Sequence, residues 1–87
     1  MNLLNKRKLV IKNQSFNYSM LDRLRTDCEY FLGNGNGHEK HLWAGSVDKQ
    51  IAEMKKIHDS LKVKPKWLPK RKIHMYERMM TSKLKNK

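Results

Sequence analysis

The strongest chemical signal in this chain is a group of cations beside aromatic residues in its last third. From Lys62 to Lys87 there are ten basic residues against a single acid, Glu77. Lysine and arginine bind phosphates electrostatically, and a nearby aromatic ring can stack on a base. The pattern therefore predicts contact with a polyanion, nucleic acid above all. The side chains that we expect to make this contact are Lys62, Lys64, Lys66, Trp67, Lys70, Arg71, Lys72 and Arg78.

A second, smaller basic group lies at the N-terminus. Residues 1–19 contain no acid, while residues 20–61 are close to neutral, so the net charge of +12 sits at the two ends. Because self-repulsion opposes a compact state, an excess of this size favours a polyanionic partner. We expect both ends to converge into one surface that contacts the nucleic-acid backbone, since lysine outnumbers the arginine that reads bases. The N-terminal residues in this prediction are Lys6, Arg7, Lys8 and Lys12.

A metal site is the next chemistry that the residue types allow. Cys28, His38 and His41 have metal-like spacing, and His58 or His74 could complete a tetrahedral zinc site. Cys28 also falls on an apolar helix face, which is typical of a buried structural thiol. We therefore predict no metal and no cofactor, and keep a zinc-stabilised interaction module as an alternative.

Catalytic patterns are weak. Asp27 and Glu29 lie on different faces of a helix, and a Cys28–His41 pair would place a thiolate on an apolar stripe. The run from Gly33 to Gly37 follows a helix and lacks the Gly-Lys-Ser/Thr of a phosphate-binding loop, so it predicts a turn. We expect a binding protein and not an enzyme.

Length and composition limit the size of the fold and of its core. The 87 residues suffice for one small domain, and 38% hydrophobic with 32% charged residues indicates a modest core with solvated ends. A modest core leaves a homodimer open. The lone cysteine excludes an internal disulfide and favours a cytoplasmic setting. No apolar run approaches the roughly 18 residues of a membrane span, so we expect no membrane partner.

Apolar spacing predicts three helices, over residues 20–32, 47–61 and 69–84. Ser19 and Ser46 are candidate N-caps, Gly33 ends the first helix through a positive φ, and Pro69 opens the third. Trp43 and Trp67 are expected to fill the core where helices meet. The predicted core faces are Leu21, Leu24, Cys28 and Phe31; Val47, Ile51, Met54, Ile57 and Leu61; and Ile73, Tyr76, Met80 and Leu84.

These elements predict a mostly α fold. A small helical domain of three helices covers residues 20–84, and a frayed basic tail covers residues 85–87. Residues 1–19 form a basic N-terminal arm, in which the β-branched stretch Leu9–Ile11 leaves a short β-strand open.

Four stretches carry a resemblance to a known family. They are LDRLRTDCEYFLGNGNG from Leu21, HLWAGSV from His41, QIAEMK from Gln50 and PKWL from Pro65. Together they resemble the large polyvalent protein-associated domain 11 family over roughly residues 20–80. The resemblance implies carriage by a phage or a conjugative element, and it implies no catalytic residues. This copy departs from the family towards cationic character at Lys66 and at residues 70–72, where acidic residues are expected.

Charge and resemblance together predict a small non-catalytic accessory protein of a mobile element. We expect it to bind nucleic acid or a host nucleoprotein, as a counter-defence inhibitor of the anti-CRISPR type whose target is a CRISPR effector nuclease. One alternative is a protein–protein inhibitor that docks on an acidic surface without touching nucleic acid, and the zinc-stabilised module is another. The sequence leaves DNA, RNA and protein partners open.

Overall fold

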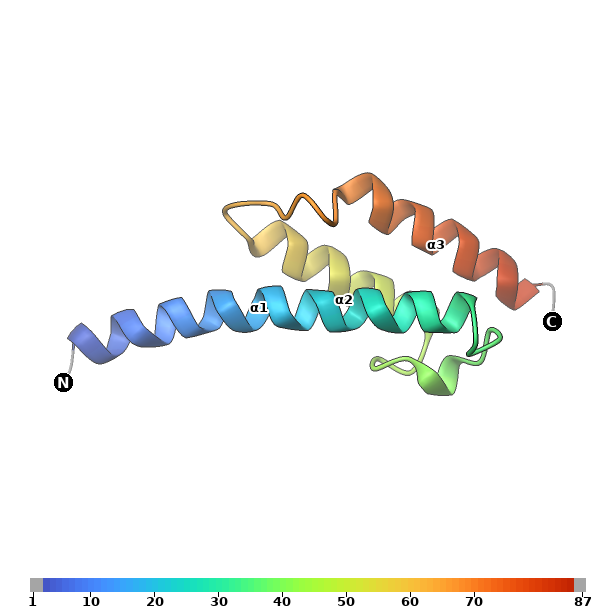
Figure 1. The fold of residues 1–87 in the computed structure, drawn as a ribbon, viewed down its shortest axis with the longest axis horizontal. Coiled ribbons are helices and arrows are strands. Elements are labelled where there is room, and N and C mark those ends of the chain that lie inside the picture. The colour runs from blue at the N-terminus through green and yellow to red at the C-terminus, as the bar shows by residue number, and fades with distance from the viewer. Residues whose placement is uncertain (1–2, 86–87) are drawn as a thin grey trace.

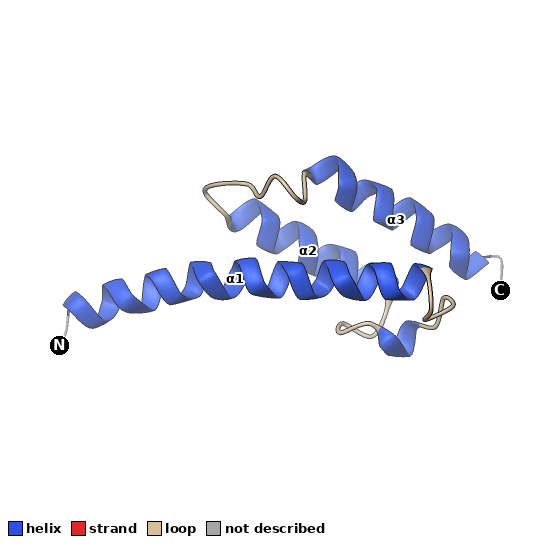
Figure 2. Ribbon diagram, viewed as in Figure 1, coloured by secondary structure: helices blue, strands red, loops and turns tan. Residues whose placement is uncertain are grey.

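The protein is a three-helix structure in which one long helix lies along a hairpin of two shorter ones (Figure 1). The computed structural model describes the backbone of residues 3–85 and the side chains of residues 15–85. The helices are α1 (Leu3–Leu32), α2 (Val47–Ser60) and α3 (Lys70–Lys85), with a short 3₁₀ helix, η1 (Glu39–His41), between α1 and α2. The described backbone contains no strand (Figure 2). The predicted fold class, a small three-helix domain, is confirmed.

The core lies where the three helices meet, and α2 packs against both α1 and α3. Each helix buries the face that its apolar spacing predicts, because side chains three and four residues apart share one side of a helix. Leu84 is the exception, being only partly buried at the end of α3. The buried predicted residues are Leu21, Leu24, Cys28, Phe31, Val47, Ile51, Met54, Ile57, Leu61, Ile73, Tyr76 and Met80.

Helix α1 begins at Leu3, well before the expected start at Met20. No glycine or proline precedes Gly33, so nothing in residues 3–32 interrupts helical hydrogen bonding. The backbone at Leu9–Ile11, where the sequence left a strand open, is accordingly helical, and Ser19 lies inside α1 and caps nothing. The side chains of residues 1–14 lie outside the described residues, so the role predicted for the basic arm stays a prediction.

The remaining helix ends agree with their local signals to within one residue. The Ser46 hydroxyl caps α2 by accepting a hydrogen bond from the Lys49 N–H at 3.2 Å, as predicted. Helix α2 ends at Ser60. Pro69 stands just before α3, where its carbonyl accepts from the Lys72 N–H at 2.9 Å.

The glycine–asparagine run is a turn, but Gly33 is not its left-handed residue. Positive φ occurs at Asn36 (54°) and Gly37 (76°). Gly35 is required for a different reason: its N–H donates to the Tyr30 carbonyl at 2.6 Å, and a Cβ at this position would lie 2.7 Å from that oxygen. The turn therefore needs the absence of a side chain at Gly35 more than it needs flexibility at Gly33.

The prediction that both tryptophans fill the core is wrong. Trp43 is 52% exposed and Trp67 is 43% exposed, while the neighbouring Leu42 and Leu68 are buried. Adjacent side chains point to opposite sides of extended backbone, such as that at Leu42 (φ −88°, ψ 137°), so one residue of the Leu42–Trp43 pair faces the core and the other faces solvent. In both connectors the leucine is buried and the tryptophan stays at the surface.

Candidate nucleic-acid interface

The segment between α2 and α3 contains a tight turn that presents Lys66 and Trp67 to solvent. The Leu68 N–H donates to the Pro65 carbonyl at 3.2 Å, which closes a four-residue turn with Lys66 and Trp67 at its centre. Both end residues of the turn, Pro65 and Leu68, are buried, whereas Lys66 is exposed. The buried ends anchor the turn, so its two central side chains lie on the surface.

Lys64 holds the segment to the end of α2. Its ammonium donates to the carbonyls of His58 (2.6 Å), Leu61 (2.7 Å) and Asp59 (3.2 Å). The last carbonyls of a helix have no partner within the helix and carry the negative end of its dipole, so a lysine is well suited to bind them. Lys64, predicted as a phosphate ligand, is therefore a helix cap in this structure.

Two further contacts tie the same segment to the rest of the domain. The Tyr18 hydroxyl of α1 donates to the Val63 carbonyl at 2.5 Å. The buried His58 ring places Nε2 3.0 Å from the Leu68 carbonyl, a contact that requires the proton on Nε2. Since these bonds fix both halves of the segment, the turn at Lys66 and Trp67 is pre-organised.

The structure divides the predicted cations into partnered and unpartnered ones. Lys70 forms an ion pair with Asp59 that lowers the pKa of that carboxyl, and the Lys72 ammonium lies 6.0 Å from the centre of the Tyr76 ring. Four other cations are exposed and make no ion pair with any described residue. These are Lys62, Lys66, Arg71 and Arg78. We call the group formed by Lys62, Lys66, Trp67 and Arg71 the linker site.

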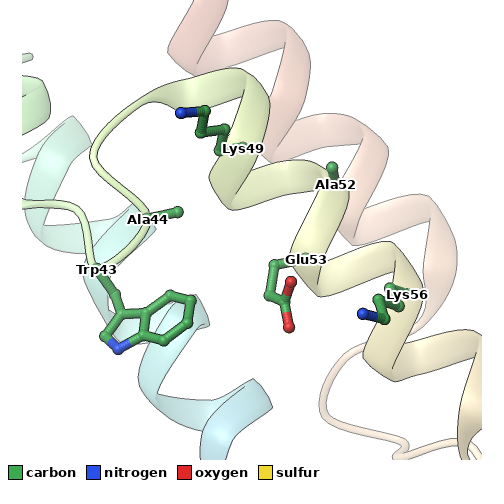
Figure 3. Close-up of a pocket in the computed structure, with 6 residues that line it drawn as sticks. All are labelled: Trp43, Ala44, Lys49, Ala52, Glu53 and Lys56. Carbon is green, nitrogen blue, oxygen red and sulfur yellow. The ribbon is translucent and has the colours of Figure 1, made fainter.

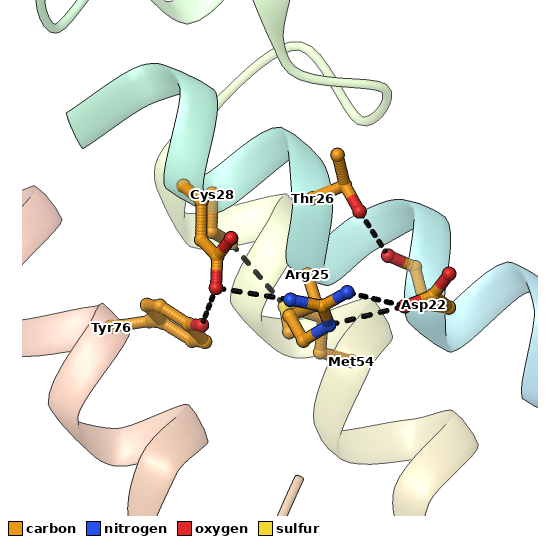
Figure 4. A network of polar contacts seen from close by, with 7 residues as sticks. Asp22, Arg25, Thr26, Cys28, Met54 and Tyr76 are labelled. Carbon is orange, nitrogen blue, oxygen red and sulfur yellow. Dashed lines mark hydrogen bonds and ion pairs between the residues drawn. The ribbon is translucent and has the colours of Figure 1, made fainter. Parts of the chain in front are cut away.

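The Trp67 ring contacts the Arg25 guanidinium, which is itself fixed by hydrogen bonds to two carboxylates. The Arg25 guanidinium carbon lies 5.7 Å from the Trp67 ring centre, within range of a cation–π contact. Arg25 donates to Asp22 at 2.6 and 3.1 Å and to Glu29 at 3.0 Å, and the Asp22 bond is the main reason that the pKa of Arg25 is raised (Figure 4). The sequence offered no signal for this contact, because Arg25 and Trp67 lie on different elements.

The Arg25 network continues to α3 through Tyr76. The Tyr76 hydroxyl donates to Glu29 at 2.8 Å (Figure 4). Burial raises the pKa of Tyr76 to about 12, and the bond to Glu29 acts in the same direction. Tyr76 was predicted as part of a core face, and it joins the α1 ion network to that core.

The fold uses most of its carboxylates internally. Of the eight acidic residues, all but Asp48 and Glu53 bond to another described group. Some accept from backbone, as Asp27 does from the Trp43 N–H and Glu39 from the Val47 N–H. Others pair with side chains, as Glu77 does with Lys55 at 3.0 Å. The fold therefore leaves few carboxylates to offset exposed cations, among them those of the linker site.

The exposed face of α3 extends the linker site along the molecule. Arg71, Met75 and Arg78 follow at helical spacing, so Arg71 and Arg78 begin about 10 Å apart on one side of the helix. Met75 is 36% exposed and Met79 is 46% exposed on this face. The surface thus combines cations with two adaptable apolar side chains.

The structure describes only part of the surface on which the two basic ends are predicted to converge. The Tyr18–Val63 bond places the middle of α1 beside the linker segment, and the N-terminal half of α1 extends past that segment (Figure 1). The C-terminal end of α3 lies at the opposite end of the molecule. Because the side chains of Lys6, Arg7, Lys8 and Lys12 are outside the described residues, a continuous surface stays a prediction.

The second exposed tryptophan, Trp43, sits in a different electrostatic setting. It lines a pocket of about 510 Å³ with Ala44, Ala52 and the charged residues Lys49, Glu53 and Lys56 (Figure 3). The Trp43 N–H donates to Asp27 at 3.0 Å, and the Ala44 N–H donates to the buried Gln50 side chain at 2.9 Å. The unpaired Glu53 carboxylate makes this pocket a poorer place for a phosphate than the linker site.

The candidate zinc ligands do not come together. Cys28 is fully buried with its Sγ 3.5 Å from the Met54 sulfur, whereas His38 and His41 are exposed and lie near each other after the glycine turn. Among the described residues, no three His, Cys, Asp or Glu side chains form a group that could hold a metal ion. Burial raises the pKa of Cys28 to about 12, so this thiol is a poor nucleophile near neutral pH.

Comparison with known protein families matches most of the chain, including its packed helical core. A family model for large polyvalent protein-associated domain 11 matches residues 14–80, most of the chain. The chain belongs to this family. The match ends at Met80, the last fully buried residue of α3, and it includes the whole linker site of this family member. Searches of curated proteins and of solved structures found no match.

One further observation concerns membranes. Within the part of this family member that the structure describes, no helix has the length and apolar character needed to cross a bilayer.

Proposed function

We propose that this protein is a non-catalytic accessory protein of a mobile element that binds the phosphate backbone of nucleic acid through its linker site. One observation carries the proposal: Lys62, Lys66 and Arg71 are exposed, make no ion pair with a described residue, and lie within five positions of the half-exposed Trp67 in the chain. The segment that bears them is held by Lys64, Tyr18 and His58, so binding does not have to order it. Membership in a family of domains associated with large polyvalent proteins supports the accessory role.

The proposed contact is to backbone and not to base edges. Lysine is a compact point charge that suits phosphate, and the site has a single arginine able to form a planar bidentate contact. Each neutralised phosphate contributes about −0.9 to the slope of log affinity against log salt on duplex DNA and about −0.7 on a single strand. Binding by the linker site should therefore be strongly salt-dependent and tolerant of sequence.

The biological form that we propose is inhibition in counter-defence. A small basic protein that occupies nucleic acid, or the nucleic-acid surface of a host nucleoprotein, would obstruct a nuclease acting there. An anti-CRISPR type of inhibitor is the specific version of this proposal. Its support is the carriage by a phage or conjugative element that the family resemblance implies.

A pair of charge-reversal variants tests the proposal. The first carries Lys62→Glu, Lys66→Glu and Arg71→Glu in the linker site. The second, a matched control, carries Lys40→Glu, Lys49→Glu and Lys56→Glu, which are unpaired surface lysines outside the linker site. Both variants change the net charge equally, so they differ only in where the charge is changed. Affinity for a labelled 20-nucleotide strand and a 20-base-pair duplex is measured from about 50 to 200 mM salt.

We expect the linker variant to lose at least about 30-fold in affinity at the lowest salt. The loss of three phosphate contacts should reduce the salt slope by about two on the single strand and by nearly three on the duplex. The control should lose much less, because it only lowers the general field of the protein. Equal losses in both variants would show that the linker site has no special role. Absence of binding at about 50 mM salt, where phosphate contacts are strongest, would refute the proposal.

A second candidate function is docking on an acidic protein surface. The observation that favours it is the exposure of Met75 and Met79 beside Arg71 and Arg78 on α3, since methionine adapts to varied protein partners. Met75→Gln with Met79→Gln separates the two functions. The double change should leave nucleic-acid affinity within about twofold, whereas loss of an inhibitory activity with retained nucleic-acid binding would favour protein docking.

A further inference from the structure

We infer that the linker site takes a single strand of nucleic acid, with one unpaired base stacked on Trp67 between phosphates bound by the flanking cations. The inference rests on the proposed function and narrows it to a class of ligand. It concerns the same site, and it adds a role for the one aromatic side chain that the turn presents.

The first support is the rigidity of the Trp67 platform. The Arg25 guanidinium lies against the ring at 5.7 Å, and two carboxylates fix that guanidinium. The turn itself is closed by the Leu68–Pro65 bond and anchored by the buried Leu68. A side chain that is already held in place loses little conformational entropy when a ligand packs on it.

The second support is the exposure that remains. With Arg25 against the ring and Leu68 in the core, Trp67 still has 43% of its surface exposed. An indole that the fold needed only for packing would be expected in the interior, where its large apolar area stabilises most. The remaining exposed area is available to another flat group.

The third support is the placement of charge along the chain. Lys62 and Lys66 precede Trp67 and Arg71 follows it, so cations lie on both sides of the aromatic residue. Asp22 and Glu29, which hold the Arg25 guanidinium, are both bonded to Arg25. Alternation of cations with an aromatic ring is the arrangement by which proteins hold single strands, because phosphates and bases alternate along them.

A duplex is a poorer ligand than a single strand for stacking on Trp67. In a duplex the bases are already stacked on one another, so an aromatic ring can stack only after the helix is opened. A single strand offers its bases without that cost. Duplex can therefore bind through its phosphates alone, and Trp67 should matter for the single strand only.

Trp43 provides the matched control within the same chain. It too is about half exposed and lies on a segment fixed by hydrogen bonds, but its pocket contains the unpaired Glu53 (Figure 3). If stacking depends on cations with no unpaired acid beside them, removal of Trp43 should not affect binding. If any exposed tryptophan suffices, the two should behave alike.

The test uses tryptophan fluorescence and affinity in parallel. In a Trp43→Phe background, Trp67 is the sole tryptophan, and titration with a 20-nucleotide deoxythymidine strand should quench its emission, whereas a 20-base-pair duplex should not. Trp67→Ala should weaken strand binding about tenfold and duplex binding less than twofold, in line with the loss of one base–aromatic stack. Trp67→Phe keeps a stacking ring and should recover most of the affinity. Trp43→Ala should leave both affinities unchanged.

The outcomes separate the inference from the proposed function. Salt-dependent binding of strand and duplex with no quenching and no effect of Trp67→Ala overturns the stacking inference and leaves backbone binding standing. No binding of either probe at about 50 mM salt overturns both. Circular dichroism of each variant checks the fold, and Trp67→Phe, which retains a ring over Arg25, keeps the test valid if Trp67→Ala is destabilised.

Discussion

The two connectors of this protein, on either side of α2, are built from opposite kinds of hydrogen bond. In the first, between α1 and α2, side-chain oxygens of Asp27, Glu39 and Gln50 accept from backbone N–H groups. In the second, between α2 and α3, Lys64 and Tyr18 donate to backbone carbonyls. Each connector holds one leucine in the core and one tryptophan at the surface.

The dipole of α2 explains the part of this difference that lies at the helix ends, at Glu39 and Lys64. The first connector leads into the N-terminus of α2, where unpaired N–H groups attract acceptors and negative charge. The second leaves its C-terminus, where unpaired carbonyls attract donors and positive charge. The signs of Glu39 and Lys64 therefore follow from the direction of one helix, and they need no ligand to explain them.

The comparison also identifies the charges that the fold does not need. Helix capping accounts for Lys64, and the pair with Asp59 accounts for Lys70. Lys62, Lys66 and Arg71 have no such role among the described residues. This difference is why we assign the proposed binding to these three cations and not to the whole basic segment.

The largest stability effect is expected at Gln50, a residue of α2 whose side chain bonds to the first connector. Its side chain is fully buried, accepts from the Ala44 N–H and donates to the Leu24 carbonyl at 3.2 Å. Gln50→Ala removes both bonds and leaves a cavity, so it should cost about 3 kcal/mol in the free energy of unfolding. Urea denaturation measures the loss. The neighbouring exposed Lys49→Ala should stay within about 0.5 kcal/mol, and a similar loss there would contradict a specific role for Gln50.

The next effect tests the turn that opens the first connector. Gly35→Ala forces a Cβ to 2.7 Å from the Tyr30 carbonyl and 2.9 Å from the Tyr30 ring, and it should cost about 2 kcal/mol. Gly33→Ala is the control, since its Cβ would lie 3.3 Å from the Glu29 carbonyl and should cost less than about 1 kcal/mol. Thermal melting of both variants gives the order. The reverse order would mean that the sequence prediction for Gly33 was the better one.

The two lysines at the start of the second connector should separate stability from binding. Lys64→Met leaves the last carbonyls of α2 without their donor and should cost about 1 to 2 kcal/mol. Lys62→Met should change stability by less than about 0.5 kcal/mol, because Lys62 bonds to no described group. Lys62→Met should nevertheless weaken strand binding. Equal stability losses in the two variants would contradict the division between capping and free cations.

The smallest effect concerns pH and the Asp59–Lys70 pair, which joins the end of α2 to the start of α3. Lys70 lowers the pKa of Asp59 in the folded protein, so the pair contributes stability above the usual carboxyl pKa near 4 and loses it as pH falls through the lower folded pKa. The melting temperature of Asp59→Asn should therefore be slightly below that of the parent at pH 7, and the two should converge at pH 2. Glu53→Gln serves as the control. A gap that persists at pH 2 would exclude the ion pair as its cause.

Features that depend on local periodicity could be predicted from the amino-acid order. The buried stripes of all three helices and the Ser46 cap need only residues within a few turns of one helix. The burial of Gln50 was missed, although it lies among Val47, Ile51 and Met54 on the same face and the spacing alone carried that signal. The start of α1 was missed because a stretch without helix breakers was assigned to an arm.

The amino-acid order by itself determined which helix faces are apolar, where the glycine turn falls and how strongly positive the ends are, because composition and spacing are properties of the chain. Tertiary structure decided which leucine or tryptophan of each pair is buried, that Arg25 lies against Trp67, and that Lys64 caps a helix while Lys62 and Lys66 stay free. The reason is geometric: these roles depend on which distant groups packing brings within a few ångströms, and spacing along the chain does not encode that distance.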